Sequence, residues 1–165
     1  MSEAREPSAS VRFKIVDPAS DAAVVAMMGY FGELEERFEN GFDADEALAS
    51  DAEKFRHPHG ALLVGFVSDD GDERPVVCGG ITTLAPEVTE VKRVWVHPDA
   101  RGAGLGREIM ARLERLAAEA GSRIVRLDTN SVLTEAIRMY ETSGYRSIDA
   151  YNDNPYARRW FEKEL

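Results

Sequence analysis

A glycine-rich turn joins an expected strand to an expected amphipathic helix in the middle of the chain. Residues 88–96 are expected to form the strand, and four aliphatic residues between 105 and 116 recur at helical spacing. Gly102, Gly104 and Gly106 stand between the two elements, at alternate positions. Such a turn leaves backbone N–H groups open at a helix N-terminus, where the helix dipole favours an anion such as a diphosphate. The pattern predicts an anion-binding turn; the alternative is a sterically tight turn with a solvated arginine.

The charged residues beside this turn narrow the class of anion site. Arg101 and Arg107 add fixed positive charge. A P-loop is disfavoured because no Gly-Lys-Ser/Thr sequence follows the glycines. Asp128 stands where the ribose-binding acid of a dinucleotide fold would, but the glycines lack the three-residue step before the last one. Neither ATP hydrolysis nor nicotinamide binding is therefore expected.

The rest of the chain predicts a mixed α/β or α+β fold. The acidic segment 42–59 has no clear period and is expected to be a connection with one short helix at most. The other expected elements are a strand at 11–15, two helices or one kinked helix between 18 and 41, strands at 61–67, 75–84 and 88–96, a helix at 105–121, a strand at 124–127, a helix at 134–144, and strands at 145–151 and 159–161. This order indicates a central mixed sheet of six to seven strands flanked by about four helices. Residues 1–10 are expected to form a flexible arm and 11–165 a single domain.

Composition limits the partners and the compartment. The 165 residues carry 30 Asp and Glu against 20 Lys and Arg, a net charge of -10 that repels nucleic acid and anionic lipid. The lone Cys78 lies in an apolar run and is expected to be a reduced core residue. Residues 1–10 lack an apolar signal core, and no stretch reaches the roughly 18 apolar residues of a membrane span. We therefore expect a cytoplasmic protein without nucleic-acid or membrane partners.

Two further groups of titratable residues are expected to have simple roles. His57, His59 and His97 have no carboxylate or cysteine at a recognised ligand spacing, so no metal site is expected. Four glutamates between residues 33 and 39 form the solvated face of a helix in the simplest interpretation, and the alternative is that Glu33 or Glu36 meets a cationic acceptor.

Two motifs resemble the GNAT superfamily of N-acetyltransferases. Its acetyl-CoA signature is Arg or Gln, two residues, Gly, one residue, then Gly or Ala, and residues 101–106 fit every position. A later block from Asn130 to Tyr145 is similar to a second family pattern, with Met139 in place of an aliphatic residue and Tyr145 in place of Phe. The resemblance covers residues 88 to 148. It extends more widely to a bacterial subgroup that is sometimes fused to MarR-type regulators, and it implies a GNAT-like fold and an acetyl-CoA-dependent N-acetyltransferase.

The resemblance also implies which residues bind the cofactor, acetyl-CoA. Backbone N–H groups of the strand before the glycines would hold the acetyl carbonyl, unless they are paired in the sheet. Asn130 would hold the pantetheine amides; alternatively it completes a turn. The implied cofactor-binding residues are Val94, Trp95, Val96, Arg101, Gly102, Ala103, Gly104, Leu105, Gly106, Arg107, Asn130 and Tyr140.

Two residues are candidates for the chemistry. Tyr140 occupies the family position that protonates the leaving sulfur, a task that suits a neutral phenol, although an aromatic at helical spacing is commonly core packing. Glu90 is the candidate general base, and strand alternation is expected to put it on one face with Lys92, Val94 and Val96. Lys92 could instead pair with Glu90 as a surface salt bridge of little energetic weight.

The family's acceptor pocket would be lined by Tyr30, Glu33, Tyr151 and Asn152. The alternative for the loop at 152–155 is a tight turn between the last two strands. The expected acceptor is an amine of a small molecule or peptide, attacked directly in a ternary complex of a monomer or homodimer. Direct transfer is expected because the buried Cys78 is poorly placed as an acyl carrier. A protein of another class, a non-catalytic acyl-CoA sensor on the same fold, is the alternative function.

Overall fold

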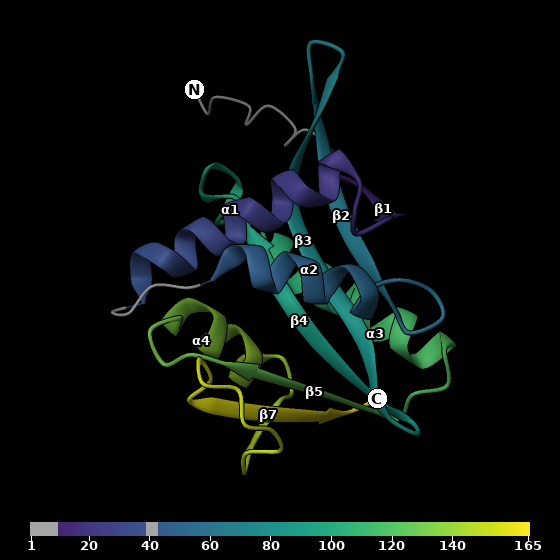
Figure 1. Ribbon diagram of the computed structural model, residues 1–165, viewed down its shortest axis with the longest axis vertical. Helices are drawn as coiled ribbons and strands as arrows, with labels where there is room; N and C mark the ends of the chain where they lie inside the picture. Colours follow the sequence, from purple (N-terminus) through teal and green to yellow (C-terminus); the bar gives the residue numbers. More distant parts are fainter. Residues whose placement is uncertain (1–9, 39–42) are drawn as a thin grey trace, which may run out of the picture.

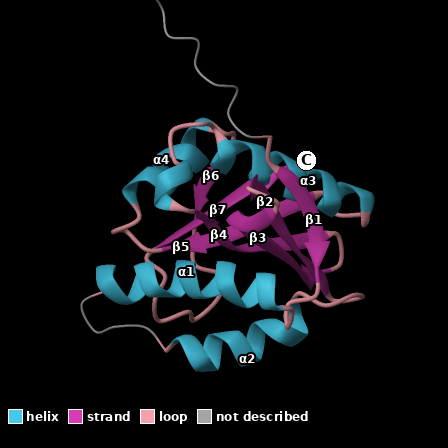
Figure 2. Cartoon of the chain, turned by 90° about the horizontal axis from the view of Figure 1, so that it is seen from above, coloured by secondary structure: helices cyan, strands magenta, loops and turns pink. Residues whose placement is uncertain are grey.

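The computed structural model describes residues 10–38 and 43–165, and in these residues a seven-stranded sheet lies between two pairs of helices (Figures 1 and 2). The elements are β1 (Arg12–Val16), α1 (Asp21–Arg37), α2 (Ala44–Lys54), β2 (Gly60–Asp69), β3 (Asp72–Ala85), β4 (Val88–Val96), α3 (Leu105–Glu119), β5 (Ile124–Thr129), α4 (Thr134–Thr142), β6 (Arg146–Ile148) and β7 (Arg159–Glu164). The strand order is β1-β2-β3-β4-β5-β7-β6, with β4 and β5 parallel and the other pairs antiparallel. The predicted mixed α/β fold is confirmed.

Two hydrophobic cores hold the helices on opposite faces of the sheet. Figure 2 shows α1 and α2 on one side and α3 and α4 on the other. The first core packs α3 and α4 side chains, such as Leu113 and Ile137, against Val91 and Phe161 of the sheet. The second packs α1 side chains, among them Phe31, against strands β2 to β4. In the described part of the chain, no helix is long and apolar enough to cross a bilayer.

Helix α1 is a single helix, where the sequence predicts two helices or a kink. Ser20 caps it, because its hydroxyl accepts a hydrogen bond from the Ala23 N–H. Gly29 lies within the helix, where a Cβ would stand 2.7 Å from the Trp95 ring. This glycine lets the indole pack against the helix, and it need not break the helix. The stop signal predicted at 40–41 and most of the arm at 1–10 lie outside the described residues.

Helix α2 occupies most of the segment 42–59, for which the sequence indicates a connection that could carry one short helix. It has 11 residues and begins after Asp43, whose carboxylate accepts a hydrogen bond from the Glu46 N–H. Its fully buried residue is a carboxylate, Asp51, at 1% exposure. Its apolar face is small: Ala44, Ala47 and Leu48 pack against the second core, and the next position on that face is Asp51, so hydrophobic periodicity did not reveal the helix.

A bulge at Arg93 changes the face to which the end of β4 points. The backbone there is left-handed, with φ 62°, and the register with β3 shifts in the same region. Lys92 and Trp95 face the side of α1, whereas Val94 and Val96 pack with the core under α3. The prediction that Val94 and Val96 share a face with Glu90 is therefore wrong, because one extra residue inverts the alternation.

Strands β4 and β5 pair over a short length and then separate. Their ladder joins Val88 to Ile124, Thr89 to Val125 and Glu90 to Arg126. Beyond that register the two strands diverge, which Figure 1 shows as an open wedge between them. The split exposes backbone groups of β4 immediately before the glycine-rich turn.

Candidate functional site

Two cavities meet at the split between β4 and β5. The first, of about 410 Å³, lies beside the glycine-rich turn; the second, of about 740 Å³, lies between α2, the sheet and the loop before β7. Tyr30 and Leu34 of α1 and Leu133 before α4 line both cavities. A molecule in one cavity can therefore reach a molecule in the other past these three side chains.

The first cavity carries the features of an anion site. Gly102 and Gly104 have φ values of 89° and 80°, and a Cβ added at either would meet no described atom within 4 Å. The space above the turn is thus open. In the described part of the chain no side chain caps α3, so the N–H groups of its first turn face this space. Dipole and open donors together favour a negatively charged group there.

The arginines around the first cavity are held by neighbouring side chains. Arg101 donates to the Val96 carbonyl at 3.0 Å and to Glu33 Oε2 at 2.5 Å. The same glutamate accepts a hydrogen bond from Trp95 Nε1 at 2.9 Å and pairs with Arg37 at 3.0 Å. Glu33 therefore fixes the edge of the first cavity.

Most of the predicted cofactor residues lie together. The lining of the first cavity includes Val94, Trp95, Val96, Arg101, Gly102, Gly104, Leu105, Gly106 and Arg107. Ala103 and Tyr140 are outside the described lining of both cavities, and Asn130 lines the second one. The Asn130 side chain donates to the Tyr156 carbonyl and accepts from the Val132 N–H, so it holds the loop geometry.

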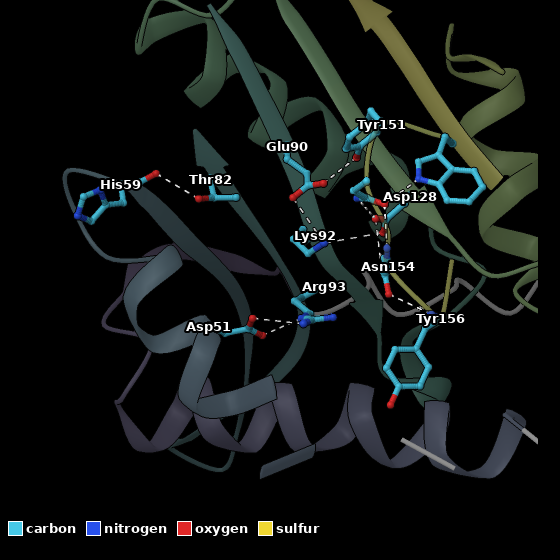
Figure 3. A network of polar contacts seen from close by, with 12 residues as sticks. Asp51, His59, Thr82, Glu90, Lys92, Arg93, Asp128, Tyr151, Asn154 and Tyr156 are labelled. Atoms are coloured by element: carbon cyan, nitrogen blue, oxygen red, sulfur yellow. Dashed lines mark hydrogen bonds and ion pairs between the residues drawn. The ribbon is translucent and has the colours of Figure 1, made fainter. Parts of the chain in front are cut away.

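A polar network crosses the second cavity (Figure 3). Lys92 Nζ lies 3.5 Å from Glu90 Oε1 and 3.8 Å from Asp128 Oδ1. The Tyr151 hydroxyl donates to the other oxygen of Glu90 at 2.7 Å. Asn152 Nδ2 donates to Asp128 Oδ2, also at 2.7 Å. The network joins β4, β5 and the loop before β7.

A buried ion pair joins α2 to the bulge of β4. Arg93 donates to both carboxylate oxygens of Asp51, at 2.7 and 3.2 Å, as Figure 3 shows. Its guanidinium also lies over the Phe31 ring, 5.1 Å from the centroid. The pairing raises the pKa of Arg93 despite burial, so the guanidinium stays charged. The pair holds α2 against the second cavity.

Tyr30, which lines both cavities, is partly buried, and Tyr140 is buried. Burial raises the pKa of Tyr30 and, together with the nearby Tyr30 and Asp128, raises the pKa of Tyr140. Both therefore remain protonated donors at neutral and moderately alkaline pH. Tyr140 is 6% exposed and packs against Tyr145 and Phe161.

The predicted acceptor residues divide between the two cavities. Tyr30 lines both, Glu33 lines the first and Asn152 lines the second, while Tyr151 contacts the second through Glu90. Sequence reasoning did not assign Asp51, whose helix has only a short apolar face. It also did not predict that Asp128 lies beside Lys92, because chain order alone does not bring these two residues together.

The histidines and carboxylates that the structure describes are not arranged as a metal centre. Across residues 10–38 and 43–165, no group of three or more His, Cys, Asp or Glu side chains is arranged to hold an ion. His59 uses its backbone carbonyl to accept from the Thr82 hydroxyl (Figure 3).

Comparisons with known proteins agree with this geometry. A family model described as the acetyltransferase (GNAT) family matches residues 28–145. An uncharacterized N-acetyltransferase of Schizosaccharomyces pombe is 29% identical over 116 residues, which cover 68% of this chain and 68% of that protein. Three other curated relatives match over less than half of this chain and less than half of their own length.

Solved structures with low sequence identity share the fold. A GNAT-family acetyltransferase of Staphylococcus aureus has a TM-score of 0.78 at 12% identity, with 94% of this chain and 99% of that chain covered. The PaiA N-acetyltransferase of Thermoplasma acidophilum, in complex with coenzyme A, has a TM-score of 0.72 at 12% identity, with the same coverage of 94% and 99%.

Proposed function

Because this chain belongs to the GNAT family of acetyltransferases, we propose that it moves an acetyl group from acetyl-CoA directly to an amine in a ternary complex. The observation that carries the proposal is the meeting of two cavities at Tyr30, Leu34 and Leu133, beside the split of β4 and β5. One cavity suits a diphosphate, and the other suits a polar acceptor. Direct transfer needs both ligands to be present with their reacting ends at this junction.

The residues of the first cavity fit acetyl-CoA. The open left-handed glycines and the uncapped end of α3 would bind the diphosphate, with Arg101 and Arg107 beside it. Arg107 is already oriented, because it donates to the hydroxyls of Thr142 and Ser143. Acetyl-CoA supplies an activated carbonyl and a thiol leaving group. Backbone N–H groups of β4 in the split would hydrogen-bond the carbonyl oxygen.

The second cavity supports an amine-bearing acceptor. Its lining is rich in hydroxyl, amide and charged side chains, which bind a polar molecule better than an apolar one. The predicted role of Tyr140 as the acid for the leaving sulfur remains a proposal, and the base for the amine would be a carboxylate of this second cavity. Glu90 has both oxygens engaged, one by Tyr151 and one near Lys92.

Cys78 gives a test of direct transfer. Its side chain is buried, burial raises its pKa to about 12, and its thiol donates to the Arg93 carbonyl. At pH 8 roughly one thiol in ten thousand is then a thiolate, the form that could carry an acyl group. We expect the folded protein to show no mass increase after incubation with acetyl-CoA alone. Cys78→Ser, which keeps a donor at this position, should retain turnover within about twofold; an acetyl adduct on Cys78 would establish an acyl-enzyme route.

A panel of amines tests the proposed function. Release of thiol from acetyl-CoA is followed with polyamines, amino acids, aminoglycosides and peptide N-termini, and the products are identified by mass spectrometry. We expect amine-dependent thiol release for at least one class. The competing function, an acyl-CoA sensor, predicts calorimetric binding of acetyl-CoA with no amine-dependent release in any class.

A further inference from the structure

Asp128 stands further into the split than Glu90. The last paired register of β4 and β5 joins Glu90 to Arg126. Asp128 follows two residues later on β5, about 6.6 Å beyond this level. It therefore lies where the strands have begun to diverge, and it lines the second cavity. In the close view its carboxylate points toward Lys92 across the opening (Figure 3).

The charges buried beside the second cavity leave one carboxylate without a cation of its own. Arg93 is matched by Asp51 in a bidentate pair. Lys92 lies between Glu90 and Asp128, so one ammonium serves two carboxylates. These five groups sum to one negative charge. Burying an excess charge is costly, and it is typical of sites that receive a ligand of opposite charge.

The two oxygens of Asp128 differ in their contacts. Oδ2 accepts from Asn152 at 2.7 Å and from Asn154 at 3.3 Å. Oδ1 lies 3.8 Å from Lys92 Nζ, and no described residue donates a hydrogen bond to it. Asn152 is itself fixed, because Trp160 Nε1 donates to its Oδ1 at 3.0 Å. Oδ2 is therefore held in place by two asparagine side chains, while Oδ1 can still accept a hydrogen bond.

The negative charge of Asp128 affects the pKa values of groups on three neighbouring elements. Its charge contributes to raising the pKa of Tyr30 on α1 and of Tyr140 on α4, and it supports the charge on Arg93. Glu90 contributes in the same way only to Tyr151, among the shifts resolved in the described residues. Its place two residues beyond the last paired register puts Asp128 further into the split than Glu90, toward the place where the two ligands would react.

We propose that Asp128 is the catalytic carboxylate that binds the acceptor's ammonium group and takes a proton from it. The inference rests on the proposed acetyl transfer and assigns to Asp128 the role that sequence reasoning gave to Glu90. Glu90 and Tyr151 act as positioning residues, which hold Lys92 beside Asp128. The acceptor class is a primary amine that arrives as a cation.

The proton balance is simple. A primary ammonium passes one proton to Asp128 Oδ1, and the neutral nitrogen then forms a bond to the thioester carbonyl carbon. The carbon–sulfur bond breaks, Tyr140 gives its proton to the leaving sulfur to form the thiol, and the second nitrogen proton restores the Tyr140 hydroxyl. Asp128 returns its proton to water. The products are an amide, a thiol and one released proton.

The test compares two isosteric substitutions that each remove one carboxylate charge. Asp128→Asn should lower kcat/KM for the amine about 10- to 100-fold, as expected for a lost charge-assisted hydrogen bond. Glu90→Gln removes a positioning contact to Lys92 and should lower it less than Asp128→Asn does. Melting temperature and acetyl-CoA affinity should be close to the parent in both. The Asp128→Asn deficit should shrink for an acceptor of lower pKa, which is already neutral at the assay pH; a purely structural role would not produce this difference.

A binding measurement separates this inference from the proposed function. Without turnover, n-butylamine is titrated into the coenzyme A complex, and the side-chain amide signals of Asn152 and Asn154 are followed by NMR. They should shift in the parent and not in Asp128→Asn. If n-butylamine shifts these amide signals but no amine is acetylated, the proposed acetyl transfer is overturned, while the proposed amine-binding site at Asp128 stands. The role of Asp128 would be overturned if Asp128→Asn kept kcat/KM for the amine within twofold of the parent. It would also be overturned if Glu90→Gln lowered kcat/KM more than Asp128→Asn did.

Discussion

Replacing Tyr140 by phenylalanine should lower kcat by about 10²- to 10⁴-fold, the range that a positioned general acid contributes. The substitution keeps the ring, which packs against Tyr145 and Phe161 with centroids 5.8 and 6.0 Å away, and removes the hydroxyl alone. Affinity for acetyl-CoA should stay nearly unchanged, because Tyr140 is outside the described lining of the first cavity. Steady-state kinetics with both substrates saturating and calorimetry with acetyl-CoA measure the two effects.

Tyr145→Phe provides the matched control. Tyr145 belongs to the same aromatic group, and its hydroxyl donates to Glu114 Oε2 at 3.2 Å, an interaction that joins β6 to α3. Its loss should affect stability slightly and kcat by no more than about twofold. Equal, small losses of kcat in the two variants would make Tyr140 a core residue.

The pH dependence of the parent enzyme should be consistent with this role. Burial raises the pKa of Tyr140 above its ordinary value near 10, so the group keeps its proton as the pH rises toward that value. Its capacity to donate is therefore present at neutral pH and is lost only above the raised pKa. A fall in kcat that begins between pH 7 and 9 would have to come from another group.

The strands, helices α3 and α4 and the glycine-rich turn were predictable because their sequences carry local signals. Residues 105–116 repeat at helical spacing, and glycine marks both the turn and the end of α3. Within β4 the predicted alternation of side chains between the two faces of the sheet is wrong after Lys92. The bulge there uses an arginine in a left-handed conformation, which glycine usually supplies, and the arginine is held by Asp51 from another helix. No local pattern predicts such a contact.

The acceptor side of the site depends on contacts between distant segments. Asp51, Lys92 and Asp128 belong to three elements separated by 36 or more residues in the chain, and each reads on its own as an ordinary surface charge. They indicate a site only when their burial and pairing are known, because the buried cations and carboxylates beside the second cavity then sum to one negative charge. The first cavity was easier to predict, because one continuous segment forms most of it.

Replacing Gly104 by aspartate should weaken acetyl-CoA binding by more than about 100-fold. A Cβ at this position meets no described atom within 4 Å, so the side chain has room above the turn, although the left-handed backbone at φ 80° is strained for any residue but glycine. The carboxylate would then stand at the open N-terminus of α3, where a diphosphate would otherwise bind, and would repel it. Calorimetry with acetyl-CoA measures the loss.

Two controls separate charge from backbone strain. Gly104→Asn has a similar shape and tolerates the left-handed conformation at φ 80° about as well, but it carries no charge. It should bind acetyl-CoA more tightly than the aspartate variant and less tightly than the parent. Gly71→Asp places the same residue at φ 88° in the β2–β3 turn, away from both cavities, and should leave binding unchanged. If Gly104→Asp binds acetyl-CoA like the parent, the glycines serve only the geometry of the turn, and the diphosphate site must be elsewhere, because no charge effect would then operate at the end of α3.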